Sequence, residues 1–395
     1  MIIPVAPSRV SALLQTSQLH AAGLAIMRDK AAIYPLQVMA VRTPAANIIK
    51  QEMLSCGGEC AVPMGAVTCS QTHCNIVLLG TRRQYQVLCT KLQQMNYFGL
   101  KALQEELSYF LAQPKVQTVL ADGRIISYAQ LQVMGIINVT PDSFHAASRH
   151  HELQEILATA GKMLQDGATI LDIGGESSRP GADSVSPAEE SARVVPVITA
   201  IKQAYPEAII SLDTYHSATA QAGIAAGADI INDISAGTAD TAMLSVAAEH
   251  GTPIILMHMR GTPKDMQQTT AYTDVVAEVT TYLLERAAAC AAVGLGPDKV
   301  ILDPGIGFAK KTPDNLKLMQ GLEALCGHGY PVLLAASRKT VIGEALGGVP
   351  VEQRLAGTVA TSCQAVYAGA NMVRVHDVAE NVQAVRMLEA IRQCQ

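Results

Sequence analysis

Eight short apolar segments in the later part of the chain are each followed by side chains that can hydrogen-bond or carry charge. Any one such residue is most often a turn residue or a helix cap. A polar group after every one of the eight segments instead favours a common site in which carboxylates, amides and cations bind a small molecule. The residues, in chain order, are Asn138, Asp172, Asp213, Asn232, His258, Asp303, Ser337-Arg338-Lys339, and Arg374 with His376.

One group of these residues offers hydrogen-bond donors together with acceptors. It consists of Asp213, Asn232, Asp303 and Lys339. Carboxylate and amide oxygens accept hydrogen bonds, whereas the amide nitrogen and the ammonium group donate them. A flat nitrogen heterocycle with an amide and amidine edge needs both kinds of partner. We therefore expect this group to hold such a ring.

A second group suits an anion. Arg374 and His376 can donate to phosphate oxygens, and the loops after the seventh and eighth strands are the usual anion site of a (β/α)8 barrel. The amide oxygen of Asn138 can bind Mg2+ when the metal also holds phosphate. This group therefore predicts a phosphate site with Mg2+ bound at Asn138.

The apolar segments themselves predict the elements that position these residues. Runs of this length without polar alternation are typical of strands buried on both faces, and each gap is long enough for a crossover helix. Eight such units predict an α/β fold of the closed (β/α)8 TIM barrel type, with its site at the C-terminal strand ends. A dinucleotide-binding open sheet is disfavoured because Gly174-Gly175-Glu176 lacks the G-x-G-x-x-G spacing. The predicted strands are Val133–Val139, Thr169–Ile173, Ala208–Leu212, Asp229–Ile231, Pro253–Met257, Lys299–Leu302, Pro331–Ala335 and Asn371–Val375.

The chain is longer than a barrel alone, which takes about 250 residues. We expect residues 1–114 to form a smaller mixed α/β domain, with a helix at Pro44–Leu54 and a strand at Asn75–Leu79. The pattern of residues 115–131 predicts a hairpin linker that turns at Asp122-Gly123. We expect this hairpin to cover the bottom of the barrel, which residues 132–395 form.

The role of this N-terminal domain stays open. Its cysteines lack the paired C-x2-C spacing of a zinc ribbon, so buried thiols are favoured over a metal site, although the metal interpretation remains an alternative. These cysteines are Cys56, Cys60, Cys69, Cys74 and Cys89.

Composition excludes several classes of function. A net charge of -5 and the absence of Trp give no case for nucleic-acid binding. No apolar run reaches the roughly 20 residues that span a bilayer. Nine cysteines fit reduced thiols better than a disulfide framework, and the N-terminus lacks a signal-peptide pattern. We therefore expect a cytoplasmic metabolic enzyme that acts on small molecules.

The strand-end motifs resemble those of the dihydropteroate synthases, a family of pterin-binding TIM barrels. The resemblance covers Gln132 to the end of the chain, and the motifs follow in the family's order. They are Met134–Phe144 (MGIINVTPDSF), Ile170–Gly181 (ILDIGGESSRPG), Ser211–Thr214, Ile231–Ile234, Leu256–Met259, Leu302–Gly305, Ser337–Lys339 and Arg374–Asp377.

This resemblance implies a transferase of folate biosynthesis. The enzyme would condense 6-hydroxymethyl-7,8-dihydropterin pyrophosphate with 4-aminobenzoate to give 7,8-dihydropteroate and pyrophosphate. Departure of pyrophosphate, assisted by Mg2+, would leave a cation at the pterin methylene, which Asp303 stabilises before the arylamine attacks. The family also implies a homodimer.

The resemblance assigns roles residue by residue. The pterin would be held by Asp213, Asn232, Asp303 and Lys339. The pyrophosphate would be held by Asn138 with Mg2+, Arg179, Arg374 and His376. The aminobenzoate would be held by Ser178, Arg179, Pro180, Phe308, Ser337 and Lys339. Asp172 and Met257 are further substrate-binding candidates, and Asp213, Asp303, Lys339 and Arg374 are the catalytic candidates.

Two loops are expected to close over the site, Thr140–His150 and Gly175–Pro187. One position in the first loop departs from the family, because Ala146 stands where an acid usually helps to shield the cation. We hypothesise that His145 or Glu152 partly compensates, or that turnover is slower. A comparison of kcat between Ala146→Asp and wild type tests whether the missing acid matters. If kcat does not increase in Ala146→Asp, the absence of the acid does not slow the enzyme.

Two alternatives remain. A methyltetrahydrofolate:corrinoid methyltransferase-type barrel would share the pterin contacts, but it has no pyrophosphate for Arg374 and His376 to bind. A non-catalytic barrel serving as a binding module is the other. Pyrophosphate release, measured with and without aminobenzoate, separates the three.

Overall fold

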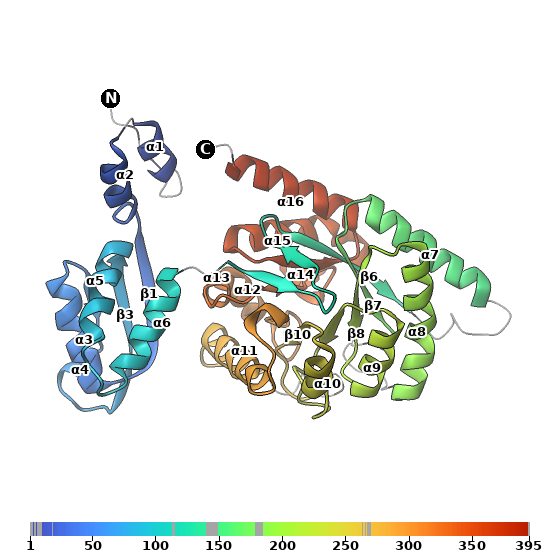
Figure 1. Ribbon diagram of the computed structural model, residues 1–395, viewed down its shortest axis with the longest axis horizontal. Helices are drawn as coiled ribbons and strands as arrows, with labels where there is room; N and C mark the ends of the chain where they lie inside the picture. The colour runs from blue at the N-terminus through green and yellow to red at the C-terminus, as the bar shows by residue number, and fades with distance from the viewer. Residues whose placement is uncertain are drawn as a thin grey trace. The chain divides into compact units, whose positions relative to one another are not determined.

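The computed structural model describes residues 10–17, 19–112, 115–139, 149–177, 185–262 and 270–393, together with residues 3, 5, 264 and 266. The chain divides into two compact units (Figure 1). Residues 1–114 and residue 395 belong to the first unit, and residues 115–394 belong to the second. Each unit has a hydrophobic core of its own.

The first unit contains an antiparallel sheet with strand order β1-β3-β2. Along β3 the side chains alternate between buried and exposed, and Cys74, Ile76 and Leu78 join the core that the helices complete. The mixed α/β character expected here is confirmed. The elements are α1 (Val10–Thr16), α2 (Ala21–Arg28), β1 (Ile33–Arg42), α3 (Thr43–Ser55), β2 (Glu59–Ala61), α4 (Met64–Val67), β3 (His73–Thr81), α5 (Arg82–Leu92) and α6 (Leu100–Ala112).

In the second unit, the described residues include eight parallel strands in the order β11-β10-β9-β8-β7-β6-β13-β12. The two end strands approach each other at a parallel bridge between Leu302 and Val332. The Leu302 N–H also donates to Pro331 O at 2.8 Å. The predicted (β/α)8 barrel is therefore confirmed. Its strands are β6 (Gln132–Asn138), β7 (Ile170–Gly174), β8 (Ile209–Asp213), β9 (Ile230–Asp233), β10 (Ile254–Met257), β11 (Val300–Asp303), β12 (Leu333–Leu334) and β13 (Met372–Val375).

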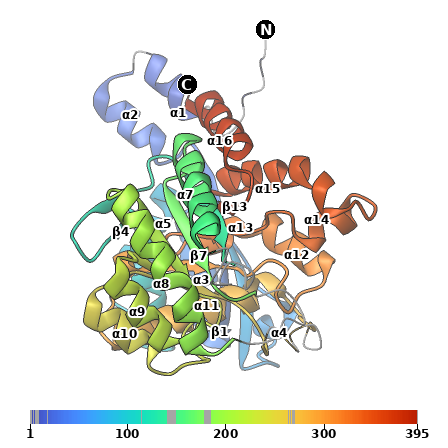
Figure 2. The same ribbon diagram turned by 90° about the vertical axis from the view of Figure 1, so that its right-hand side faces the viewer.

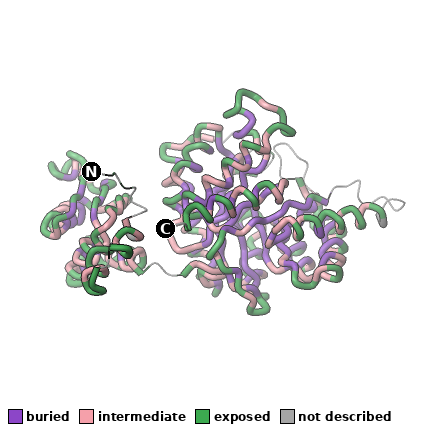
Figure 3. Tube along the Cα trace, turned by 90° about the horizontal axis from the view of Figure 1, so that it is seen from above, coloured by how far each residue is buried: buried purple, intermediate pink, exposed green. Residues whose placement is uncertain are grey.

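Helices alternate with the strands and surround the barrel (Figure 1, Figure 2). Figure 3 shows buried residues concentrated in the middle of this unit and exposed residues on its outer helices. Because helices cover the outer face and side chains fill the interior, the strands carry nearly continuous apolar sequence. The helices are α7 (Arg149–Gln165), α8 (Pro187–Ala204), α9 (Ser217–Ala226), α10 (Met243–His250), α11 (Val275–Ala292), α12 (Thr312–Gln320), α13 (Leu322–Cys326), α14 (Thr340–Ala345), α15 (Leu355–Ala368) and α16 (Val378–Gln393).

A hairpin precedes the barrel and packs on its N-terminal end. Strands β4 (Gln117–Val119) and β5 (Ile125–Ser127) pair antiparallel. Leu120 and Ile126 are buried in a cluster to which every barrel strand contributes one apolar side chain. The Lys299 ammonium group donates to Val119 O at 2.6 Å, which fixes the hairpin backbone. The barrel side chains of this cluster are Met134, Ile170, Ile209, Ile230, Ile255, Ile301, Leu333 and Met372.

The hairpin offers a paired stability test. We expect Ile126→Ala to lower the free energy of unfolding by about 2–4 kcal/mol, because Ile126 is 5% exposed and its loss leaves a cavity. Ile125→Ala, one residue away at 57% exposure, is expected to change it by less than about 0.5 kcal/mol. Urea unfolding of both variants measures the difference. Equal losses would contradict the packing of the hairpin into the barrel.

Candidate active site at the mouth of the barrel

An ion-pair cluster that is largely shielded from solvent lies at the C-terminal ends of the strands. Arg374, on β13, donates from Nε to Asp172 Oδ2 at 2.5 Å and from Nη2 to Asp213 Oδ2 at 2.7 Å. Asp172 is on β7 and Asp213 ends β8, so strand β6 lies between Arg374 and Asp172, and strands β6 and β7 lie between Arg374 and Asp213. Residues separated by 202 and 161 positions meet here, because a closed barrel brings all its strand ends to one mouth.

Asp172 links this ion pair to the ring-binding group predicted from the sequence. Its carboxylate is 0% exposed. The Ser211 hydroxyl donates to Oδ1 at 2.5 Å, and the Asn232 amide donates to both carboxylate oxygens at 3.3 Å. A buried carboxylate requires such partners because an unpaired buried charge is strongly destabilising. Asp172 therefore orients Asn232 and Arg374 together.

Burial and neighbouring charges shift the pKa values of Arg374 and Asp213. Burial by itself lowers the pKa of Arg374, but the carboxylates of Asp172 and Asp213 outweigh burial, so the pKa is raised and the guanidinium group stays charged. Burial raises the pKa of Asp213 to about 7, with Arg374 opposing the shift and Asp172 adding to it. Asp213 therefore titrates near neutral pH, unlike an ordinary carboxyl group.

Asp303 and Lys339 form the neighbouring part of the mouth. Asp303 ends β11, and its Oδ1 accepts from the Gly305 N–H at 2.7 Å. Lys339 donates to Ile306 O at 2.6 Å, and its Nζ lies 4.7 Å from the centre of the Phe308 ring. Burial raises the pKa of Asp303, which Lys339 counteracts. Burial also lowers the pKa of Lys339 to about 8, against the attraction of Asp303.

Ser337 and His376 bring the two adjacent strand ends β12 and β13 together. The Ser337 Oγ lies 3.0 Å from His376 Nδ1 and accepts from the His376 backbone N–H at 3.1 Å. The imidazole is thereby held beside a hydroxyl group, directly after the end of β13, the strand that carries Arg374. Asn138, by contrast, is the exposed last residue of β6, between β7 and β13.

An apolar wall completes the mouth. Met257 and Phe308 are buried in one small cluster with Ile234, Met266 and Ala309, and Tyr215 packs against it. Flat rings bind against such side chains through burial of apolar surface and aromatic contacts. The mouth therefore combines an apolar wall, a buried carboxylate–amide set and several cations.

Some predicted residues lie outside the described part of the chain. Ser178, Arg179 and Pro180 are among them, as are Ala146 and His145 and most of the two loops expected to cover the site. Glu152, the other residue proposed to compensate for Ala146, lies in the first turn of α7. Its Oε2 is shielded from solvent and has no hydrogen-bond partner among the described residues.

The side chain of His258 packs inside the protein and does not join the ion-pair cluster. It follows β10 and is 2% exposed, with its ring edge-on to Tyr282 of α11 at 4.9 Å between centroids. Burial, with help from Lys310 and Arg260, lowers its pKa to about 2, so the imidazole is neutral. Among the strand-end residues, His258 thus belongs to the packing between β10 and α11.

Sequence reasoning missed buried charges beside the mouth. Glu190, on α8, is 1% exposed and accepts from the Thr214 hydroxyl at 2.7 Å. Glu176 accepts from the Tyr215 hydroxyl at 2.7 Å. Glu190 was detectable, because it lies four residues before Val194 on the apolar face of its helix. No sequence signal distinguished Glu176 from a solvated loop acid.

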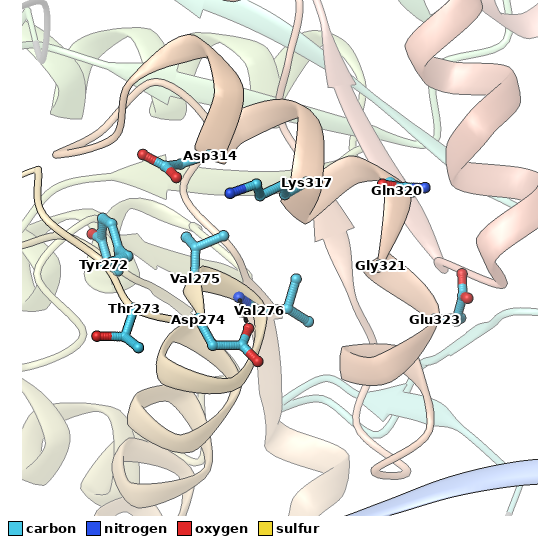
Figure 4. Close-up of a pocket in the computed structure, with 10 residues that line it drawn as sticks. All are labelled: Tyr272, Thr273, Asp274, Val275, Val276, Asp314, Lys317, Gln320, Gly321 and Glu323. Carbon is cyan, nitrogen blue, oxygen red and sulfur yellow. Dashed lines mark hydrogen bonds between the residues drawn. The ribbon is translucent and has the colours of Figure 1, made fainter.

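A separate cavity of about 530 Å³ lies between the start of α11 and α12 (Figure 4). Asp314 and Lys317 extend from α12 toward it, and Asp274 caps the first turn of α11. None of the predicted site residues lines this cavity, so it is distinct from the barrel mouth. Its lining residues are Tyr272, Thr273, Asp274, Val275, Val276, Asp314, Lys317, Gln320, Gly321 and Glu323.

Within the ranges that the structure describes, no three His, Cys, Asp or Glu side chains are grouped as a metal site. The described cysteines, those of the N-terminal unit included, carry free thiols. No described helix combines the length and apolarity needed to cross a bilayer.

Comparison with known proteins gives consistent matches. Residues 134–376 match the family model described as pterin binding enzyme, which places the match within the barrel unit. The dihydropteroate synthase of Escherichia coli is 44% identical over 270 residues, covering 68% of this chain and 95% of the relative.

Two solved structures of the dihydropteroate synthase of Xanthomonas albilineans are similar in fold. One, with 4-aminobenzoic acid, has a TM-score of 0.66 at 40% identity and covers 71% of this chain and 100% of that chain. The other, in complex with 7,8-dihydropteroate, has a TM-score of 0.62 at 38% identity and covers 70% of this chain and 98% of that one.

Proposed function

The chain belongs to the dihydropteroate synthases, within the pterin-binding enzyme family, and from this premise we propose how its barrel mouth performs the reaction. The enzyme is a transferase of folate biosynthesis. It condenses 6-hydroxymethyl-7,8-dihydropterin pyrophosphate with 4-aminobenzoate and releases pyrophosphate.

The pterin ring binds to the carboxylate–amide set in this proposal. Asp213 accepts hydrogen bonds from the amide and amidine edge of the ring, and Asn232 donates to that edge. Asp172 orients Asn232 by accepting a hydrogen bond from its amide group. Asp303 lies beneath the ring, and Met257 packs against its face. The support for this assignment is that Asp172, Asn232 and Asp303 are buried and Asp213 is partly buried at adjoining strand ends, which limits access of water and strengthens each hydrogen bond.

The pyrophosphate binds to the cationic side of the mouth, with Arg374, His376 and Arg179 as donors. The two bonds from Arg374 to carboxylates use Nε and Nη2, so Nη1 takes part in neither. A guanidinium group held on two sides offers a phosphate oxygen a preorganised donor. The ion pairs of Arg374 with Asp172 and Asp213 support a phosphate site directly beside the ring site.

Mg2+ fits this side of the site. Asn138 presents a neutral amide oxygen in an exposed position at the end of β6, and Mg2+ is commonly held by few protein ligands plus phosphate oxygens and water. When bound there, the ion would help to neutralise the negative charge of the leaving pyrophosphate.

The 4-aminobenzoate binds where Phe308 and Lys339 face each other, with Ser337, Ser178, Arg179 and Pro180 as its further ligands in this proposal. The Lys339 ammonium group lies 4.7 Å from the Phe308 ring centre, so one pair of residues supplies both an aromatic contact and a cation for the carboxylate. The proposal for Ser178, Arg179 and Pro180 rests on the family resemblance alone.

The reaction follows from these placements. Arg374 and His376 stabilise the charge that develops on the leaving pyrophosphate, so the bond to the pterin methylene breaks before the new bond forms. Asp303 stabilises the resulting cation. The arylamine is nucleophilic by itself, so the enzyme needs to orient it and exclude water rather than activate it.

The observation that carries this assignment is the double ion pair of Arg374 with Asp172 and Asp213. The experiment is to incubate the full-length protein with pterin pyrophosphate, with and without 4-aminobenzoate, in Mg2+ and in EDTA. We expect dihydropteroate and pyrophosphate in equal amounts, dependent on both aminobenzoate and Mg2+. No pyrophosphate release at all would favour the methyltransferase-type or the non-catalytic barrel.

The pH dependence follows from two shifted groups. Asp213 must be ionised to accept from the pterin, so kcat/KM for pterin pyrophosphate should fall as pH drops through about 7. Lys339 must be protonated to bind the carboxylate of 4-aminobenzoate, so kcat/KM for 4-aminobenzoate should fall as pH rises through about 8. Asp213→Asn should remove the acid limb while lowering the plateau, because the variant has no carboxyl group to titrate at this position. An acid limb near pH 4 would show that Asp213 titrates as an ordinary carboxyl group.

Assembly and organisation complete the proposal. We infer a cytoplasmic homodimer formed through the last helices, where Tyr367, Met387 and Ile391 on α15 and α16 are 62%, 62% and 56% exposed. Residues 1–114 form a separate domain, and residues 115–131 link it to the barrel of residues 132–395. Sedimentation equilibrium of wild type and Met387→Glu tests the dimer, because a charge in an apolar contact should favour the monomer.

A further inference from the structure

Lys310 is a buried lysine that the proposed reaction does not use. It is 3% exposed and follows the turn after β11. Among the described residues, its Nζ donates to His258 O at 3.1 Å, Gly305 O at 3.0 Å and Phe308 O at 2.9 Å. These acceptors match the donors of one ammonium group. Burial lowers the pKa of Lys310, while the carboxylate of Asp303 favours its charged form.

The turn that Lys310 binds has an unusual backbone. Gly305 and Gly307 have φ angles of 70° and 87°, and Ala309 has a φ of 52°. A Cβ at Gly305 would lie 2.1 Å from His258 O, so this glycine allows the turn to approach β10. Such a conformation persists only where the surroundings fix it. The hydrogen bonds of Lys310 join the two ends of this turn to the residue that follows β10.

The same turn carries groups of the candidate active site. Ile306 O accepts the hydrogen bond from Lys339, and the Phe308 ring lies below the Lys339 ammonium group. The Gly305 N–H donates to the carboxylate of Asp303. A displacement of this turn therefore moves the acceptor that places Lys339, the ring that faces it and a donor to Asp303.

We propose that Lys310 is a positioning residue for the aminobenzoate end of the site, and that its ammonium group fixes the turn 305–309 so that Ile306 and Phe308 place Lys339. This inference rests on the proposed role of Lys339 and Phe308 in substrate binding. Lys310 itself touches no substrate. It acts through the backbone of the turn, and its buried position makes that action independent of solvent.

Variants around the turn separate this role from a general effect. Lys310→Met removes the donors with little change in length. Lys311→Met is the matched control, because Lys311 is the exposed neighbour in sequence. Asn315→Ala loosens the same turn by another route, since Asn315 accepts from the Gly307 N–H at 2.8 Å and donates to Lys310 O at 3.2 Å.

The measurements are steady-state kinetics of the full-length enzyme between pH 6 and 10, with either substrate varied. We expect Lys310→Met to lower kcat/KM for 4-aminobenzoate on the order of 10²-fold, as small displacements of reacting groups do. The alkaline limb assigned to Lys339 should move upward, because a released Lys339 becomes more solvated. Lys311→Met should match wild type. A loss of folded protein alone would lower the rate equally at every pH and leave the limb unmoved.

The outcomes distinguish a failure of the proposed function from a failure of the positioning role of Lys310. If wild type forms no dihydropteroate, the proposed function fails. If wild type is active and Lys310→Met has the same kinetics and the same alkaline limb, the positioning role alone is wrong. If Lys310→Met does not fold, Asn315→Ala gives the answer, with a smaller reduction and an upward limb supporting the proposal and wild-type behaviour overturning it.

Discussion

Arg374→Gln is expected to lower kcat/KM on the order of 10³-fold, the largest effect on activity that the structure predicts. In the proposed reaction, the substitution removes a preorganised cation that stabilises the leaving pyrophosphate. It also leaves the buried carboxylate of Asp172 and the partly buried carboxylate of Asp213 without their common partner. For that second reason we expect the free energy of unfolding at pH 8 to fall by about 3–5 kcal/mol.

The loss of stability in Arg374→Gln should depend on pH. Arg374 opposes the rise in the pKa of Asp213, so without the guanidinium group the folded-state pKa of Asp213 rises further above its unfolded value. A carboxyl group raised in the folded state destabilises the fold once the pH exceeds the unfolded value, and the penalty grows until the folded value is passed. The deficit relative to wild type should therefore be smaller at pH 4 than at pH 8, and its increase should begin only as the pH exceeds about 7, the pKa of Asp213 with Arg374 present.

Urea unfolding at several pH values and steady-state kinetics measure these effects. Arg386→Gln is the control, because Arg386 forms an ion pair with Glu389 at 2.8 Å on α16 with its side chain 31% exposed. That variant should keep wild-type kinetics and lose no more than about 1 kcal/mol. Arg374→Lys should have a kcat/KM and a stability between those of wild type and Arg374→Gln, since a lysine keeps the charge but cannot bridge two carboxylates. Near-wild-type activity in Arg374→Gln would contradict the site.

The second large effect is expected for Asp172→Ala, through stability. Removing this carboxylate leaves the charge of Arg374 buried with one partner fewer, and it deprives Ser211 and Asn232 of their acceptor. We expect a loss of about 3–5 kcal/mol in the free energy of unfolding. Ser211→Ala, which removes one donor and leaves the carboxylate, should cost about 1–2 kcal/mol.

A double-mutant cycle tests whether Asp172 and Arg374 act as one unit. Asp172→Ala combined with Arg374→Gln removes both buried charges, so its cost should be clearly smaller than the sum of the two single losses. The coupling should persist at high salt, because buried pairs are screened little. Additive losses would mean that the two side chains contribute independently, which the short contact between them argues against.

Sequence patterns were sufficient for the barrel and for the residue types at its mouth. Apolar runs identify strands buried on both faces, because each face must contact other apolar side chains. The runs nevertheless mark burial rather than strand hydrogen bonding, so Pro331–Ala335 was expected as a strand where β12 spans only Leu333–Leu334. Polar residues at the strand ends lie together for a topological reason, since parallel strands in one barrel end at one mouth.

The tertiary structure decided which of these side chains meet. Sequence chemistry separated Arg374, as a phosphate ligand, from Asp213, as a ring ligand, yet the two are joined at 2.7 Å. His258 follows a strand as the others do, but its ring packs against α11. Lys310 and Lys311 are identical in type and adjacent, and only one is buried. Periodicity determines which residues are buried, whereas side-chain partners depend on how the strands are placed around the closed ring, which no local pattern encodes.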